Sequence, residues 1–177
     1  RISAIRESAR VRHEMQEEGL LNLENVRDPG VLVAIDGTLA GIDEAKKLPG
    51  LVGLVPATPD ILGDNNSVLN LPFKARTAVD MSKDPPMFYM RLRDSSGLNP
   101  DFGLVRIEMT NQPDGEPVDE AWASDIASLI MQERFPVKKT IPGWDKRIYA
   151  LFHAGEYINT LIPPPKVVTT YFGRSTA

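Results

Sequence analysis

The stretch that most constrains the fold is residues 31–38, where five apolar residues lead directly into Asp36, Gly37 and Thr38. Turn-forming residues precede this run and an Asp-Gly pair closes it, which is the pattern of a buried strand. Such a strand places the Asp36 carboxylate at the rim of a hydrophobic sheet. Metal-dependent phosphoryl-transfer enzymes often keep a metal ligand at such a rim, whereas Asp-Gly is also a common turn pair. From the residues alone, both interpretations stay open.

Length and composition limit the class of protein. The chain has 177 residues, 42% of them hydrophobic and 25% charged, so we expect a single domain, 1–177, with a buried core. It contains no cysteine, which excludes disulfides and thiolate metal sites and fits a cytoplasmic protein. We expect no membrane span, since no apolar run reaches about 18 residues. With a net charge of −4, any nucleic acid would be held by a local basic patch or by a partner.

Periodicity and turn signals predict the remaining elements and an α/β fold class. We expect an N-terminal helix and linker over 1–27 and a core over 28–172. Residues 56–86 are rich in proline and predict a long ordered loop. The other expected elements are a helix at 2–18, strands at 51–55, 87–93, 104–109 and 166–172, and helices at 120–134 and 146–162.

The strands at 87–93 and 104–109 alternate as in a β-hairpin with one apolar and one charged face. The charged face carries Arg91 and Arg93 on the first strand, and Arg106 and Glu108 on the second. A cross-strand salt bridge is one interpretation. The other is a carboxylate at a metal site, with the arginines facing phosphates.

The last predicted helix places Tyr149, His153 and Glu156 on one face, at positions i, i+4 and i+7. An imidazole one turn from a carboxylate can bind a divalent metal or orient a water molecule. The alternative is a surface or core histidine that is only hydrogen-bonded to its neighbour, and the residues alone favour it. Several other site types are excluded, because the chain has no P-loop, no dinucleotide-binding glycine motif and no nucleophile elbow.

Six short motifs, taken in chain order, resemble those of NurA-type nucleases. They include an aspartate-glycine-threonine strand end, a glycine-containing apolar strand, an arginine-threonine element and an arginine-x-glutamate strand. The chain departs from the family pattern at Pro56, where a lysine often follows the glycine-containing strand. The six motifs lie at residues 34–38, 51–55, 71–77, 88–92, 103–108 and 149–154.

This resemblance implies an RNase H-like mixed sheet flanked by helices. It also implies a metal-dependent DNA nuclease that uses Mn²⁺ or Mg²⁺ to process DNA ends, in DNA repair or defence. A homodimer that works with a HerA-type hexameric ATPase would be the assembled form. Two alternatives stay open: a catalytically inactive NurA-like interaction subunit, and another RNase H-like nuclease that acts on RNA.

The resemblance and the pattern together nominate the site residues. Asp36, Glu108 and His153 are the expected catalytic residues, and Asp36, Glu108 and Asp60 are the expected metal ligands. Asp60 is included because it follows a strand end in the middle region, where the family usually has further carboxylates. The residues expected to neutralise substrate phosphates are Arg91, Arg93, Lys138 and Lys139.

Overall fold

The computed structural model of the chain describes residues 32–43, 45–62, 66–95, 99–137 and 141–161. The helix expected at 2–18, the strand expected at 166–172, and Lys138 and Lys139 lie outside these residues.

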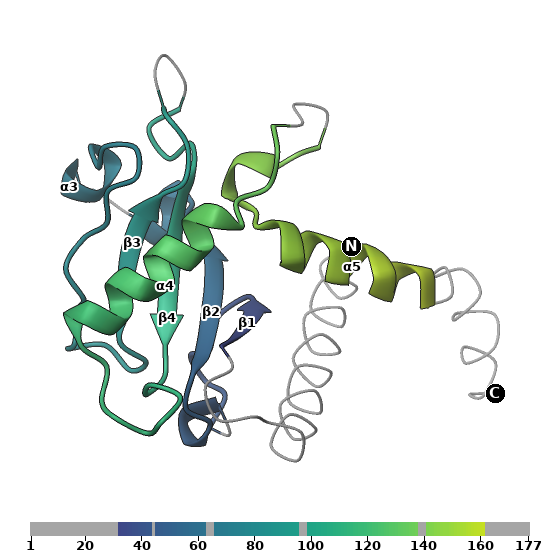
Figure 1. The fold of residues 1–177 in the computed structure, drawn as a ribbon. Helices are drawn as coiled ribbons and strands as arrows, with labels where there is room; N and C mark the ends of the chain where they lie inside the picture. Colours follow the sequence, from purple (N-terminus) through teal and green to yellow (C-terminus); the bar gives the residue numbers. More distant parts are fainter. Residues whose placement is uncertain (1–31, 44, 63–65, 96–98, 138–140, 162–177) are drawn as a thin grey trace, which may run out of the picture.

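The strands form one mixed sheet with the order β1-β2-β4-β3 (Figure 1). β1 (Val33–Asp36) is parallel to β2 (Leu51–Pro56), while β4 (Leu104–Met109) is antiparallel to both β2 and β3 (Met87–Arg91). The predicted strand that ends at Asp36, the predicted strand at 51–55 and the predicted hairpin are therefore confirmed. The mixed sheet and its helices also confirm the α/β class.

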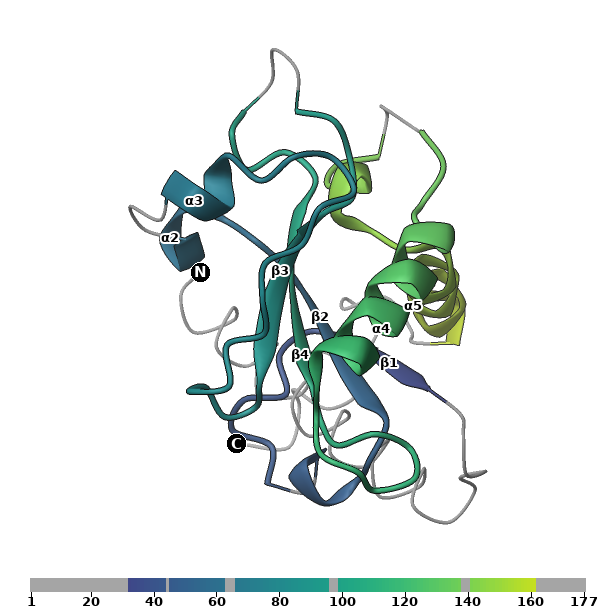
Figure 2. The ribbon, with the colours of Figure 1, turned by 60° about the vertical axis from the view of Figure 1, so that its left-hand side comes forward.

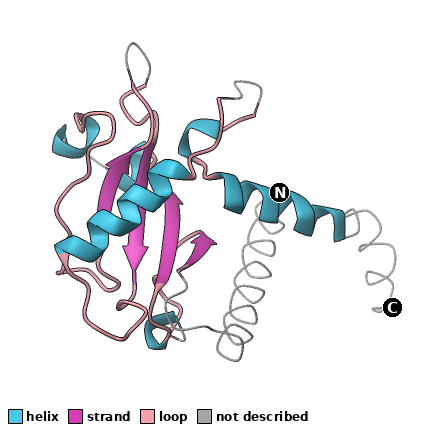
Figure 3. Cartoon of the chain, viewed as in Figure 1, coloured by secondary structure: helices cyan, strands magenta, loops and turns pink. Residues whose placement is uncertain are grey.

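Two long helices follow the sheet in the chain (Figure 3). They are α4 (Glu120–Gln132) and α5 (Tyr149–Leu161), close to the predicted bounds. Among the described helices, none combines the length and the apolar character that crossing a membrane would require. The shorter elements are α2 (Pro59–Leu62), α3 (Asn66–Leu69), η1 (Ala45–Lys47) and η2 (Trp144–Lys146).

The main core lies between the sheet and α4, which runs along one sheet face (Figure 2). The Asp119 carboxylate caps the helix by accepting a hydrogen bond from the Trp122 N–H at 2.7 Å. Leu129 of this helix is 45% exposed and does not belong to the core. The residues that fill this core are Phe88, Met90 and Leu92 from β3 and the chain just after it, Val105, Ile107 and Met109 from β4, and Ala123, Ile126 and Ile130 from α4.

The opposite sheet face is covered by loops and short elements rather than by water. Leu39, Ile42 and Leu48 pack there on Leu51 of β2, in a second apolar cluster. A third cluster joins the segment after β2 to Leu104 of β4. The hairpin face that the sequence marks as charged is therefore largely buried, and its charged side chains need partners within the protein.

Candidate functional site

Glu108 is a buried carboxylate on β4, only 2% exposed. Its Oε2 accepts hydrogen bonds from the Leu39 N–H at 2.6 Å and from the Thr38 hydroxyl at 2.8 Å. Its Oε1 lies 2.6 Å from Arg106 Nη2, so the negative charge is balanced inside the fold. Glu108 thus holds the chain that leaves β1.

Gly53 explains why this chain can reach Glu108. It pairs with Glu108 in the β2–β4 register, and a Cβ at this position would lie 2.7 Å from the Gly37 carbonyl oxygen. Only a glycine lets residues 37–39 cross β2 here without a clash. The aspartate-glycine-threonine, glycine-strand and arginine-x-glutamate motifs of the sequence consequently meet at one point.

The β3–β4 register corrects one expectation about the charged face. Glu108 pairs with Met87, and Arg91 pairs with Leu104, so neither Arg91 nor Arg93 lies opposite Glu108. The ion pair of Glu108 is made instead with Arg106, its neighbour two positions away on the same strand. Side chains at i and i+2 of a strand share a face, which allows this contact.

Asp36 and Glu108 belong to opposite faces of the sheet. Asp36 pairs with Leu54, whose side chain lies in the core beside α4, while Glu108 pairs with the next residue over, Gly53. Since faces alternate along a strand, the register does not bring these two carboxylates together as ligands of one ion. Within the described residues, no group of three or more histidine, aspartate and glutamate side chains is placed to hold a metal ion.

Asp36 is exposed at the end of β1, beside α5. His153 is an exposed residue of α5, with its ring 4.2 Å from the Tyr149 ring in an edge-on contact. Figure 1 shows β1 pointing toward α5. The structure therefore places Asp36 and His153 on neighbouring elements, while Glu108 is in the interior. Asp60 falls in α2, and its side chain is outside the described set.

Arg91 does not face a substrate phosphate. It is 1% exposed, and its guanidinium donates to the carbonyl oxygens of Leu71 at 2.5 Å, Leu69 at 2.6 Å and Pro100 at 2.8 Å. A fourth donation reaches the Phe102 carbonyl. Burial lowers the pKa of this arginine. The expectation of a phosphate ligand is corrected here: Arg91 ties two loops to the end of β3.

Arg93 differs from Arg91, because backbone carbonyl groups do not accept hydrogen bonds from its Nε and Nη2. It lies over the Trp144 ring at 5.0 Å, and its buried Nε and Nη2 have no hydrogen-bond partner. Burial lowers the pKa of Arg93, the nearby positive charge of Arg134 lowers it further, and Asp145 acts in the opposite direction. Arg93 keeps its place among the candidate anion-binding residues.

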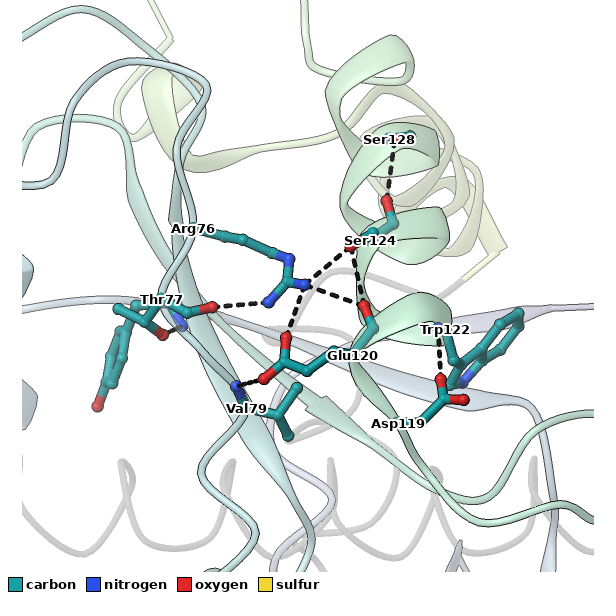
Figure 4. Close-up of polar contacts among 9 residues, drawn as sticks. Arg76, Thr77, Val79, Asp119, Glu120, Trp122, Ser124 and Ser128 are labelled. Atoms are coloured by element: carbon teal, nitrogen blue, oxygen red, sulfur yellow. Dashed lines mark hydrogen bonds and ion pairs between the residues drawn. The ribbon is translucent and has the colours of Figure 1, made fainter.

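Arg76 has a role that the sequence did not indicate (Figure 4). Its Nη2 donates to the Ser124 hydroxyl at 2.8 Å and lies 2.7 Å from the Glu120 carboxylate. The other oxygen of Glu120 accepts the Val79 N–H at 2.8 Å. The pKa of Glu120 is lowered mainly by the hydrogen bond from the Val79 N–H and, to a smaller extent, by the hydrogen bond from Arg76. These contacts tie the segment beside β3 to the start of α4.

Comparison of the sequence with protein-family models and with curated proteins gives no match. A function for this protein is therefore inferred from the geometry around Asp36, Glu108 and Arg93.

Proposed function

We propose that this chain is a NurA-type nuclease domain that hydrolyses phosphodiester bonds in DNA, with Asp36 at the reacting site. The observation that carries the proposal is the meeting of three family-like motifs where Gly53 pairs with Glu108. Their contacts fix the backbone directly after Asp36, through Thr38 and Leu39. A reacting group needs this kind of support from neighbouring residues, because small displacements weaken catalysis.

The expected Mn²⁺ or Mg²⁺ fits some of the predicted ligands and not others. Asp36 offers an exposed carboxylate, the oxygen ligand that these ions prefer. Glu108 does not fit, since its oxygens already accept the hydrogen bonds of Thr38 and Leu39 and pair with Arg106. The described residues thus give an incomplete ligand set for either ion.

The chain's own residues suggest a division of roles. Glu108 positions residues 36–39, here named the Asp36 corner, through its hydrogen bonds with Thr38 and Leu39. It acts from inside the fold and is not itself a catalytic residue. His153, on the neighbouring helix, has an exposed imidazole that can take a proton from water or give one to a leaving oxygen. DNA is the proposed substrate, and a homodimer acting with a HerA-type hexameric ATPase is the proposed assembly.

The test is cleavage of end-labelled linear DNA in the presence of Mn²⁺. We expect Asp36→Asn and His153→Ala to lower the rate by about 100-fold or more, the usual scale for positioned acid–base groups. Glu116→Gln removes an exposed carboxylate elsewhere and is the matched control. Undiminished cleavage by Asp36→Asn would refute the assignment, and preference for a labelled RNA would favour an RNA-directed enzyme.

A second candidate, a non-catalytic NurA-like interaction subunit, is favoured by one observation. The strand-borne carboxylate that would be expected in a metal site is buried and fully occupied by the protein itself. This candidate predicts that wild-type protein cleaves neither DNA nor RNA with Mn²⁺, while it still co-elutes with a HerA-type ATPase in size-exclusion chromatography.

A further inference from the structure

Three cationic side chains make contacts with two aromatic rings, and the five residues are here named the basic–aromatic cluster: Phe73, Lys74, Arg93, Arg134 and Trp144. Lys74 Nζ lies 5.3 Å from the centre of the Phe73 ring, and the Arg134 guanidinium lies 5.6 Å from the same centre. Arg93 lies over the Trp144 ring at 5.0 Å. The shared Phe73 ring thus joins Lys74 to Arg134, and the positive charge of Arg134 lowers the pKa of Arg93.

The fold brings these residues together from four separate segments. Lys74 is fixed beside the end of β3, since its N–H donates to the Arg91 carbonyl oxygen at 3.1 Å. Arg93 lies just past β3, Arg134 lies just past α4, and Trp144 begins η2. Arg134 also pairs with Ile148 in an isolated β-bridge, which holds it near the chain that leads into α5. The cluster is thus built on the frame of the sheet.

The positive charge of the cluster is balanced only in part, since Asp145 is the one acid of the described residues that acts on Arg93. Among the described residues, no ion pair joins Lys74, Arg93 or Arg134 to a carboxylate. Asp145 favours the charged form of Arg93 without forming an ion pair with it, and its carboxylate also accepts the Gly103 N–H at 2.8 Å. Like charges kept close together and partly withdrawn from water raise the energy of the protein, and an anion at this place would lower it.

We propose that the basic–aromatic cluster binds the sugar–phosphate backbone of single-stranded DNA. Cations interleaved with aromatic side chains are the usual means by which proteins follow a single strand without reading its sequence. Phe73, at 39% exposed, presents part of its ring to solvent next to Lys74. In a chain with a net charge of −4, direct contact with DNA requires a local positive patch such as this one.

The choice of DNA rests on the proposed function, but the site is distinct from Asp36 and is tested by binding alone. Fluorescence anisotropy with dye-labelled oligo(dT) in EDTA removes cleavage from the measurement. A failure of catalysis would leave this result unchanged. A failure of binding would refute the role of the cluster, whereas the role of Asp36 would still be tested by the cleavage assay of Asp36→Asn.

The full-length double variant Lys74→Gln/Arg134→Gln removes two charges of the cluster, and Lys83→Gln, an exposed lysine elsewhere, is the control. We expect wild type and the control to bind, with affinity that falls as salt rises. For the double variant, the slope of log affinity against log salt should fall by about 1.4, at roughly 0.7 per phosphate contact on single strands. Single Lys74→Gln, at an exposed position, should give about half this change and guards against misfolding of the double variant. An unchanged slope in both variants would overturn the proposal, as would wild-type binding to poly-glutamate but not to oligo(dT).

Discussion

Replacement of Glu108 by alanine tests whether this carboxylate supports the fold rather than the reaction. The change removes the acceptor of the Leu39 N–H and of the Thr38 hydroxyl, and leaves Arg106 without its ion-pair partner. Breaking a buried pair on one side costs about 3–5 kcal/mol. The side chain of Arg106 is 19% exposed, so water can partly solvate it, and we expect a loss near about 3 kcal/mol.

Thr38→Val isolates one of these contacts. A hydrogen bond to a charged group contributes about 1.5–3 kcal/mol, and this one is only partly buried, so we expect about 1–2 kcal/mol. Urea denaturation followed by circular dichroism measures both variants, with the midpoint lowered and the m-value unchanged. In the double variant the losses should not add, since both changes remove the same bond, and the coupling should be about 1 kcal/mol.

Asp36→Asn provides the contrast. Because Asp36 is exposed, this substitution should lower the free energy of unfolding by less than Glu108→Ala does, while it lowers the cleavage rate by about 100-fold or more. The reasoning is refuted if Glu108→Ala unfolds within about 0.5 kcal/mol of wild type, because the carboxylate would then not be bonded as described. Glu116→Gln serves again as the control for loss of an acidic residue.

Three further predictions follow from contacts described above. Gly53→Ala places a Cβ 2.7 Å from the Gly37 carbonyl oxygen and should cost about 1–3 kcal/mol in urea denaturation, whereas a cost near zero would mean that the crossing is looser. Arg91→Lys cannot reproduce the forked donation to four carbonyl groups and should lower the thermal midpoint by several degrees, which differential scanning fluorimetry measures. Because the pKa of Glu120 is lowered from 4.5, its contribution to stability is present above that value and is lost as pH falls through the lower, folded-state pKa. Glu120→Gln should therefore flatten the acid side of the stability profile, and an identical profile in both proteins would refute this role.

The sheet could be predicted from the sequence because its signals are local. The unbroken apolar run before Asp36 and the alternation around Phe88 and Ile107 define strands that the structure confirms. The helix cap formed by Asp119 is also a local contact, because its partner Trp122 lies only three positions further along the chain. The short helices α2 and α3 escaped prediction, because four-residue helices have too few turns for a periodic signal.

The candidate site depended on information that one stretch of sequence does not contain. Arg91 and Arg93 alternate with apolar residues in the same way, yet loop carbonyls surround the first, and the Trp144 ring contacts the second. The β3–β4 register keeps Arg91 from lying opposite Glu108, and the contact of Arg76 with Ser124 joins residues 48 positions apart. The sequence shows that these residues are charged, but only the tertiary structure shows which group each charged side chain contacts.

The bond between Thr38 and Glu108 also bears on the order in which the molecule assembles. It joins residues 70 positions apart, and β2, which lies between their strands, must be in place for them to meet. Closing so long a loop costs chain entropy before any contact is gained, and distant pairings of this kind slow folding. The Asp36 corner accordingly reaches its final shape only after β4 has joined the sheet. During synthesis, a chain that has not yet reached β4 has strand β1 in its sequence but cannot form this corner.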